Sequence, residues 1–170
     1  MKKLSETLTE LGIAFSFPIE IKDSDGNQTY CENSRGWWCK REYDSEGNQT
    51  YSKDSSGYWR KREYDSNGNA TYYENSHGSW YKREYDSNGK ETYYEDSLGF
   101  WRKHEYDSNG NEIYYEISNG FWCKHEYDSN GNETYYEDSW GNKRGTPKSS
   151  KTCNGKVIEV DGTKYKLTEL

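Results

Sequence analysis

Short runs of aromatic and polar residues alternate along most of this chain, and the pattern repeats every 21 residues. Each repeat contains two runs rich in Tyr, Trp, Thr and Phe, and a Gly-containing turn follows each run. Aromatic and β-branched residues favour strands, and regularly spaced turns favour hairpins. The pattern therefore predicts six tandem β-hairpins joined in an antiparallel meander. The repeated phrase Asp-Ser-x-Gly-Asn/Lys marks the repeats, starting at Asp23, Asp44, Asp65, Asp86, Asp107 and Asp128.

Two turns in each repeat set the predicted register. Asn-Gly stands in the first turn of four repeats, and this pair favours a two-residue type I′ loop in which both residues adopt φ > 0. The second turn reads Ser-x-Gly, where x includes His77, Leu98 and Trp140. A three-residue loop with Gly in the left-handed position accepts any such residue. One even and one odd loop keep a repeat of odd length in phase, so each face presents the same residue types throughout.

The predicted register gives the sheet two faces of different character. One face is aromatic with Arg and His, and it carries Phe100, Arg102, His104, Tyr106, Ile113, Tyr115 and Ile117. The other is acidic with a Trp and a Tyr, and it carries Trp101, Lys103, Glu105, Asp107, Glu112, Tyr114 and Glu116. Stacked repeats turn each position into a column whose members lie about 9.5 Å apart.

Three columns of the acidic face are the candidate partner-binding residues. Like charges stacked on one face repel, which favours a partner or a role in solubility. A structural role for the Trp column stays open, because aromatic ladders also supply burial that the few aliphatic residues cannot. The candidate residues are Trp59, Trp80, Trp101, Trp122, Glu63, Glu84, Glu105, Glu126, Asp65, Asp86, Asp107 and Asp128.

The two ends of the chain differ from the repeats and are predicted to cap the sheet. Residues 5–12 fit a short helix with leucines on one side, and residues 15–22 fit a first strand. The predicted fold class is all-β: an elongated antiparallel meander of hairpin repeats with a short N-terminal helix and a C-terminal β-hairpin as caps. The predicted divisions are residues 1–22 (cap), 23–144 (six-repeat array), 145–155 (linker) and 156–170 (C-terminal β-hairpin).

The charge balance narrows the choice of partner. The net charge is −7, with 30 acidic and 23 basic residues, whereas a nucleic-acid-binding surface needs a basic stripe. We therefore expect a protein with a basic surface as the partner, with no direct nucleic-acid binding and no membrane association; the resemblance given below implies that this is a host protein. The first residues form no apolar run, so we expect a cytoplasmic protein. A homodimer through the Tyr64/Tyr85/Tyr106 face is also expected, because few residues are available to cover that face.

Chemically reactive side chains form no catalytic or metal-binding pattern. The cysteines lack metal-ligand spacing, and the histidines fall in different repeats. The register places Cys31 opposite Cys39, which permits a disulfide, although free thiols are favoured. The Asp-Ser-Asn-Gly-Asn loop lacks the further ligands of a calcium loop. No nucleophile, base and orienting group come together, so we predict a non-catalytic protein without cofactor or metal.

The unit Glu-Tyr-Asp-Ser-Asn-Gly-Asn-Glu-Thr-Tyr-Tyr, seen at residues 126–136, resembles tyrosine–aspartate (YD) repeats and the MORN-variant repeats of some bacterial antitoxin-like proteins. The resemblance covers residues 23–140 and implies a β-hairpin array. Long YD-repeat proteins enclose a toxin in a shell, and six repeats are too few for that. The chain, with its entry Leu-Gly-Ile-x-Phe-x-Phe-Pro-Ile-Glu-Ile-Lys-Asp at residues 11–23, is also similar to small phage and prophage proteins.

These observations leave three functional hypotheses. The resemblance to phage proteins implies an anti-defence role, including anti-CRISPR inhibition, in which the acidic face docks on a nucleic-acid-binding protein. Regularly spaced Trp and Tyr residues are alternatively suited to stacking on carbohydrate or another surface polymer. The MORN-variant likeness implies an antitoxin-like or structural scaffold protein.

Overall fold

The computed structural model describes residues 2–148, 157–161 and 163–166 of the chain. Strands β1 to β13 follow one another in sequence order within one antiparallel sheet, and β14 pairs with β15 in a second sheet. The chain divides into two compact units: residues 1–105 with 116–120, and residues 106–115 with 121–170. The predicted all-β meander is confirmed.

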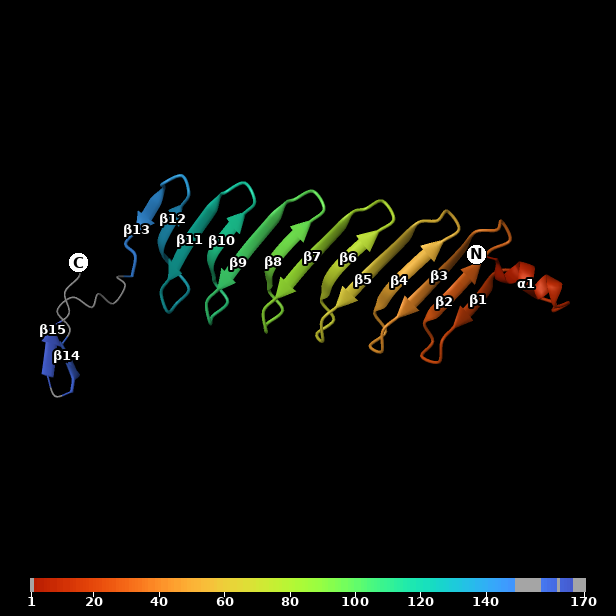
Figure 1. Ribbon diagram of the computed structural model, residues 1–170, viewed down its shortest axis with the longest axis horizontal. Coiled ribbons are helices and arrows are strands. Elements are labelled where there is room, and N and C mark those ends of the chain that lie inside the picture. Colours follow the sequence, from red (N-terminus) through yellow and green to blue (C-terminus); the bar gives the residue numbers. More distant parts are fainter. Residues whose placement is uncertain (1, 149–156, 162, 167–170) are drawn as a thin grey trace. The chain divides into compact units, whose positions relative to one another are not determined.

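The elements alternate regularly with short turns. Figure 1 shows the successive strands of the first unit running in opposite directions, with α1 beside β1 and β2. The described elements are α1 (Leu4–Glu10), β1 (Ile19–Lys22), β2 (Gln28–Glu32), β3 (Trp38–Tyr43), β4 (Gln49–Asp54), β5 (Trp59–Tyr64), β6 (Ala70–Asn75), β7 (Trp80–Tyr85), β8 (Glu91–Asp96), β9 (Trp101–Tyr106), β10 (Glu112–Ile117), β11 (Trp122–Tyr127), β12 (Glu133–Asp138), β13 (Lys143–Gly145), β14 (Val157–Val160) and β15 (Thr163–Lys166).

The first turn of each repeat differs from the predicted type I′ loop. In the β7–β8 turn the Asp86 N–H donates to the Lys90 carbonyl and the Gly89 N–H donates to the Asp86 carbonyl, so the loop contains three residues. Gly89 has a φ of 78°, whereas Asn88 has no positive φ. The prediction of a two-residue loop was therefore wrong. One left-handed glycine after a type I turn closes the loop, and Asn is spared the less favourable conformation.

A β-bulge keeps the repeats in phase despite the two odd loops. Glu84 pairs with Tyr93, but Tyr85 pairs with Glu91, so one residue of β8 has no direct partner. The extra residue changes the alternation of faces by one position, which compensates for the odd loop. The same register shift occurs in β1–β2, β3–β4, β5–β6 and β11–β12.

The second turn has the predicted geometry. The Asp96 N–H donates to the Phe100 carbonyl, and the Gly99 N–H donates to the Asp96 carbonyl. Gly99 has a φ of 81°. Leu98 occupies the variable position with its side chain 92% exposed, which explains why this position accepts many residue types.

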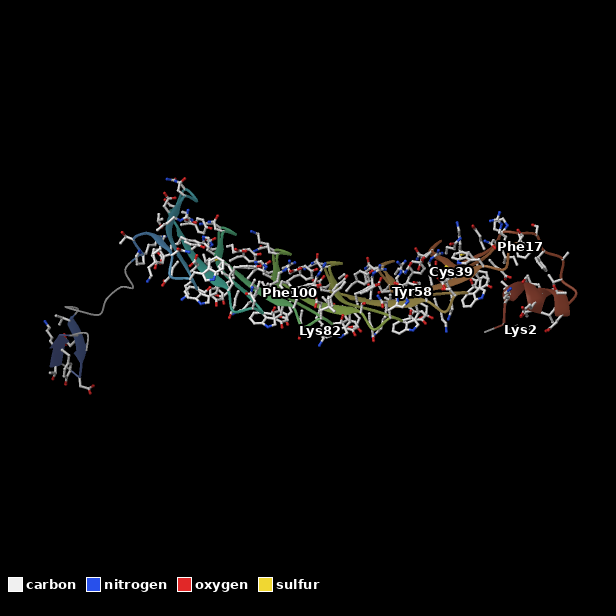
Figure 2. All side chains as sticks on the ribbon, turned by 90° about the horizontal axis from the view of Figure 1, so that it is seen from above. Lys2, Phe17, Cys39, Tyr58, Lys82 and Phe100 are labelled. Carbon is white, nitrogen blue, oxygen red and sulfur yellow. The ribbon has the colours of Figure 1, made fainter. Side chains whose placement is uncertain are left out.

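Burial within the sheet is modest and comes largely from aromatic rings. The main contacts between the described elements join neighbouring strands. Figure 2 shows side chains projecting from both sides of the ribbon, with Lys82 and Cys39 on opposite sides. Most strand residues are only half-buried. The buried apolar side chains of the described residues are Ile19, Tyr30, Trp38, Cys39, Cys123 and Tyr135.

A buried carboxylate attaches the N-terminal helix to the sheet. Glu32 is 2% exposed and accepts hydrogen bonds from the Ser5 N–H at 3.0 Å, the Ser5 hydroxyl and the Tyr30 hydroxyl at 3.0 Å. Burial opposes ionisation of Glu32, but these hydrogen bonds outweigh it and lower its pKa. The Leu4 N–H donates to the Tyr30 hydroxyl at 3.3 Å. The helix thus contacts β2, within the predicted N-terminal cap.

The termini show two further differences from the prediction. The first strand begins at Ile19 rather than at residue 15, and the segment before it contains a cis Phe17–Pro18 bond. The C-terminal hairpin pairs Val160 with Thr163 across a two-residue loop, and Asp161 has a φ of 50°. The predicted C-terminal β-hairpin is therefore present. Most of the predicted linker, from residue 149 onward, lies outside the described residues.

Candidate binding faces

The strand pairings define two faces of the sheet. The Trp face carries the columns of Trp80, Lys82 and Glu84, since Lys82 pairs with Glu95 and Glu95 pairs with Trp101. The Arg face carries the columns of Tyr81 and Arg83, since Arg83 pairs with Tyr94 and Tyr94 pairs with Arg102. The candidate Trp and Glu residues share the Trp face, as the predicted alternation requires.

Lysines partly neutralise the carboxylates of the Trp face. Lys61 lies 2.6 Å from Glu63, and Lys103 lies 2.6 Å from Glu105. The hydrogen bond from Lys61 to Glu63 raises the pKa of the lysine. The side chains of both pairs are about half exposed, so each pair contributes little to stability. The predicted acidic column is therefore one stripe of a mixed-charge surface.

The Trp column serves the sheet as well as its surface. Trp59, Trp80, Trp101 and Trp122 are half-buried. Lys82 lies over the Trp80 ring at 5.5 Å from its centre, and Lys124 lies over the Trp122 ring at 5.2 Å. These lysines shield one side of each ring through cation–π contacts. The structural role that the sequence left open for this column is thus present, whereas its role in binding stays a prediction.

The candidate aspartates form turns instead of lying on the flat part of a face. Asp65 Oδ1 accepts from the N–H groups of Asn67 and Asn69, both at 2.9 Å, and its Oδ2 accepts from the Asn69 side chain at 3.0 Å. The side-chain hydrogen bond from Asn69 is the largest of the contacts that lower the pKa of Asp65. The same contacts recur at Asp86, Asp107 and Asp128, except that Lys90 replaces the Asn after Asp86. These carboxylates are therefore occupied by their own turns.

In the second turn, too, an Asp side chain accepts hydrogen bonds from backbone N–H groups of its own turn, which the sequence analysis did not predict. Asp96 Oδ1 accepts from the N–H groups of Leu98 at 2.9 Å and Phe100 at 3.3 Å. Asp138 makes the equivalent contacts with Trp140 and Asn142. The signal in the sequence is an Asp or Asn at alternating spacings of 10 and 11 residues: Asn33, Asp44, Asp54, Asp65, Asn75, Asp86 and Asp96.

One carboxylate column lies on the opposite face from the one predicted. The prediction placed Glu112 on the acidic face, but its counterparts Glu91 and Glu133 lie with the basic residues. Glu91 contacts Arg102 at 2.6 Å and Arg83 at 3.4 Å. Glu133 contacts His125 at 2.9 Å and Arg144 at 3.1 Å. The physical reason is the β-bulge, which reverses the side-chain direction just after the first turn.

Arginines and aromatic rings alternate on the Arg face. Arg83 lies 4.6 Å from the centre of the Tyr81 ring, and Arg102 lies 5.0 Å from that of Tyr94. The rings also approach one another, at 5.2 Å for Tyr73 and Tyr81 and at 6.0 Å for Tyr81 and Tyr94. Cation–π and ring contacts therefore supply much of the cohesion of this face.

The tyrosines predicted to line a homodimer have partners inside the chain. The Tyr64 hydroxyl donates to the Gln49 carbonyl at 3.1 Å, and the Tyr85 hydroxyl donates to the Ala70 carbonyl at 3.1 Å. Tyr106 occupies the same column, at the end of β9. These bonds tie each tyrosine to the start of the preceding strand of the sheet. The homodimer itself stays a prediction.

Cys31 and Cys39 lie directly opposite one another on β2 and β3, as predicted, and both are free thiols. Burial and the neighbouring Cys31 raise the pKa of Cys39 to about 11. Burial likewise raises the pKa of Cys123. Thiols held in this way are poor nucleophiles at neutral pH. Among the described residues, no group of three His, Cys, Asp or Glu side chains is placed to hold a metal ion.

A hollow of about 200 Å³ opens on the Arg face between β3 and β5. Sequence reasoning gave no indication of it. The residues that line it are Trp37, Cys39, Arg41, Ser52, Lys53, Asp54, Tyr58 and Arg60. A neighbouring hollow of about 280 Å³ shares Trp37 and Arg41. Small side chains at Cys39 and Ser52 leave this space, since Tyr81 and Tyr94 occupy the corresponding positions two repeats later.

Fold and faces together define a tandem β-hairpin repeat protein with Trp-containing repeats. No family model matches the chain, and no curated protein matches it. Among solved structures it is similar to the Photorhabdus luminescens Tc holotoxin pore with a TccC3 mutation, at 13% identity and a TM-score of 0.45 over 74% of this chain and 9% of that one. It is also similar to the TcdB2–TccC3–Cdc42 complex, at 16% identity and a TM-score of 0.48 over 77% of this chain and 7% of that one.

The chain thus spans less than a tenth of the length of these matched chains. The scores are too low to transfer any property of those toxins to this protein. No helix in the described part of the chain is long and apolar enough to cross a membrane.

Proposed function

We propose that this protein is a non-catalytic binding scaffold whose Trp face docks on a basic surface of a partner protein. The observation that carries the proposal is the arrangement of charge on that face. Two lysines of this face each have a carboxylate on their own strand and another on the neighbouring strand: Lys61 has Glu63 and Glu74, and Lys82 has Glu84 and Glu95. Carboxylates outnumber lysines there, and half-buried Trp rings lie beside them.

The partner that fits this surface is a nucleic-acid-binding protein of the host cell. Rows of carboxylates compete with phosphates for the same Lys and Arg side chains, and such binding weakens with salt. The resemblance to phage and prophage proteins favours an inhibitor of a bacterial defence system of the CRISPR type. Because lysines pair with Glu63 and Glu105, we expect only a moderate electrostatic attraction between the Trp face and the basic partner. Contact of the partner with the Trp rings contributes the rest of the binding free energy.

The test is a pull-down from bacterial lysate with stepwise elution by salt. We expect a basic nucleic-acid-binding protein that elutes at moderate salt. A variant with Glu63, Glu84, Glu105 and Glu126 all changed to Gln should lose it. The matched control changes Asp65, Asp86, Asp107 and Asp128 to Asn, because these side chains serve the turns and Asn33 and Asn75 already occupy equivalent turn positions. Undiminished capture by the Gln variant would contradict the electrostatic proposal.

The carbohydrate alternative requires Trp rings with a free face for stacking. Lys82 and Lys124 lie over the rings of Trp80 and Trp122, which opposes stacking on that side. Glycan-array binding that survives high salt and is lost in Trp80→Ala would nevertheless favour it. An antitoxin-like or structural scaffold role predicts co-purification with a toxin encoded nearby.

A further inference from the structure

The Arg face contains one arrangement twice, with different residues. Two repeats after Arg41, Gln49 and Arg60, the same ladder positions hold Arg83, Glu91 and Arg102. The register is equivalent, because Tyr43 pairs with Gln49 beside one bulge and Tyr85 pairs with Glu91 beside the other. The later copy therefore shows what the earlier copy lacks.

In the later copy a carboxylate joins the two arginines. Glu91 contacts Arg102 at 2.6 Å and Arg83 at 3.4 Å. The Tyr94 ring lies against the same guanidinium groups, at 5.0 Å from Arg102 and 5.6 Å from Arg83. One ring and one carboxylate thus lie against two guanidinium groups, although the Arg83 Nε atom is buried without a hydrogen-bond partner in the described part of the chain.

In the earlier copy both the ring and the carboxylate are missing. Gln49 stands in place of Glu91, and Ser52 stands in place of Tyr94. Arg41 bonds to the Gln28 side chain and Arg60 to the Ser52 hydroxyl at 3.0 Å, and neither has a carboxylate partner among the described residues. The Gln49 Nε2 atom is buried without a hydrogen-bond partner. Arg41 and Arg60 therefore line the hollow without a carboxylate partner among these residues. The unpaired Gln49 stands at the ladder position that Glu91 holds between its arginines.

The space is also suited to a planar ring. The hollow of about 200 Å³ lies between Arg41 and Arg60, with Tyr58 and Trp37 in its lining. Trp37 is 44% exposed, and among the described residues its ring stacks on no other ring and its indole N–H has no acceptor. Asp54 also lines the hollow, but its Oδ1 is engaged by the N–H and hydroxyl of Ser56. The hollow is smaller than a typical drug-sized site, which restricts the ligand to a single ring.

We propose that this hollow binds a small aromatic anion, a planar ring that bears a carboxylate or a phosphate. The anionic group lies between Arg41 and Arg60 and accepts from Gln49 Nε2, as Glu91 does between its arginines. The ring fills the space that Tyr94 fills two repeats later and contacts Trp37 and Tyr58. This site is on the face opposite to the one proposed for the protein partner, so the two proposals are independent.

The experiment is a calorimetric and NMR titration of the full chain with 4-hydroxyphenylpropionate and, separately, phenyl phosphate. The first probe tests the carboxylate and the second the phosphate. The uncharged 4-hydroxyphenylpropionamide and the ringless acetate and inorganic phosphate are the controls. We expect at least one aromatic anion to bind, with shifts at the Trp37 indole and the Arg60 guanidinium, and about tenfold more tightly than its controls. Binding of the amide with equal affinity, or of no aromatic anion, would overturn the proposal.

Three variants keep the test independent of folding. Arg60→Gln should weaken binding about tenfold through loss of one charge-assisted hydrogen bond. Arg102→Gln removes the matched arginine that Glu91 already occupies, and it should leave binding unchanged. The double variant Gln49→Glu, Ser52→Tyr introduces the carboxylate and the ring that the later copy has at these two positions. It should abolish binding while its circular dichroism spectrum stays unchanged. Tight binding in this filled variant would refute the site.

Discussion

The two copies of the Arg-face arrangement show how a repeat protein separates stability from surface chemistry. Around Glu91, the chain supplies both the cations and the anion, and Tyr94 fills the space between them. Around Gln49, the backbone register is the same, but the anion and the ring are absent. Equivalent strands and turns therefore support a closed arrangement in one place and an open one in another. The copies differ at Cys39, Gln49 and Ser52, where the later copy has Tyr81, Glu91 and Tyr94. The sheet accepts these differences because hairpin geometry depends on the turns and the bulge.

The largest effect on stability should come from removal of the Glu91 carboxylate in the closed copy. Glu91→Gln leaves Arg83 and Arg102 without their carboxylate, and we expect a loss of about 2 kcal/mol in the free energy of unfolding. Glu91 is only 19% exposed, so solvent compensates little. Urea denaturation monitored by Trp fluorescence measures the change. Gln49→Ala is the control in the open copy and should cost clearly less. Equal losses in the two variants would show that the two copies do not differ in the way described.

A second carboxylate, Glu32, sharpens the comparison, because neutral donors and not arginines hold it. The hydrogen bonds from Ser5 and Tyr30 hold the pKa of Glu32 below its ordinary value despite burial. A lowered pKa stabilises the folded form above the unfolded pKa of about 4.3, and this stabilisation is lost as the pH falls through the folded pKa. We expect α1 to detach from β2 below about pH 4, at a cost of about 1 kcal/mol.

The Ser5 amide resonance, followed by NMR against pH, measures this detachment. In Glu32→Gln that acid transition of the Ser5 amide should disappear, while the turn carboxyl of Asp65, whose pKa is also lowered, still titrates. A pH-independent Ser5 amide in the unaltered protein would contradict the assignment.

Filling the hollow of the open copy with a ring should stabilise the fold, whereas removal of the Glu91 carboxylate should destabilise it. Ser52→Tyr places a ring between Arg41 and Arg60, as Tyr94 lies between its arginines, and we expect a gain of about 1 kcal/mol. Thermal unfolding followed by circular dichroism measures the gain. Thr50→Tyr, on the same strand outside the lining of the hollow, is the control and should give no gain. A destabilised Ser52→Tyr variant would show that the hollow cannot accept a ring.

The smallest effect concerns the turns that the two copies share. Asn88→Leu should change the free energy of unfolding by less than about 0.5 kcal/mol, because Leu98 occupies the same position of an identical turn. Asn88 has no positive φ, so a branched side chain meets no strain there. Gly89→Ala, at a φ of 78°, is the contrasting variant and should be clearly destabilising. A large loss in Asn88→Leu would restore the type I′ interpretation.

The repeat period, the hairpins and the two faces could be predicted from the sequence, because aromatic alternation and the spacing of Gly both point to strands and turns. The bulge could not, because a two-residue Asn-Gly loop accounts for the same parity. That error placed Glu112 on the wrong face and hid the Glu91 pairs. The candidate Trp and Glu columns were placed on a shared face correctly. The Asp column serves the turns, a role that the equally spaced Asp54 and Asp96 already indicate. The hollow depends on Cys39 and Ser52, whose small size matters only beside the larger residues of later repeats.

The bulge also determines on which face of the sheet each side chain of the array lies. Each hairpin carries two three-residue loops and one extra strand residue, so a segment of 21 residues returns every side chain to its own face. Gain or loss of a whole segment lengthens or shortens the sheet without disturbing its chemistry. A single residue inserted within a strand would instead move every later side chain to the opposite face of the sheet. Residues of the Trp face would then lie on the Arg face, and the reverse, until a further bulge reversed the change. Arrays of this kind therefore change length by duplication, and their surfaces diversify one position at a time.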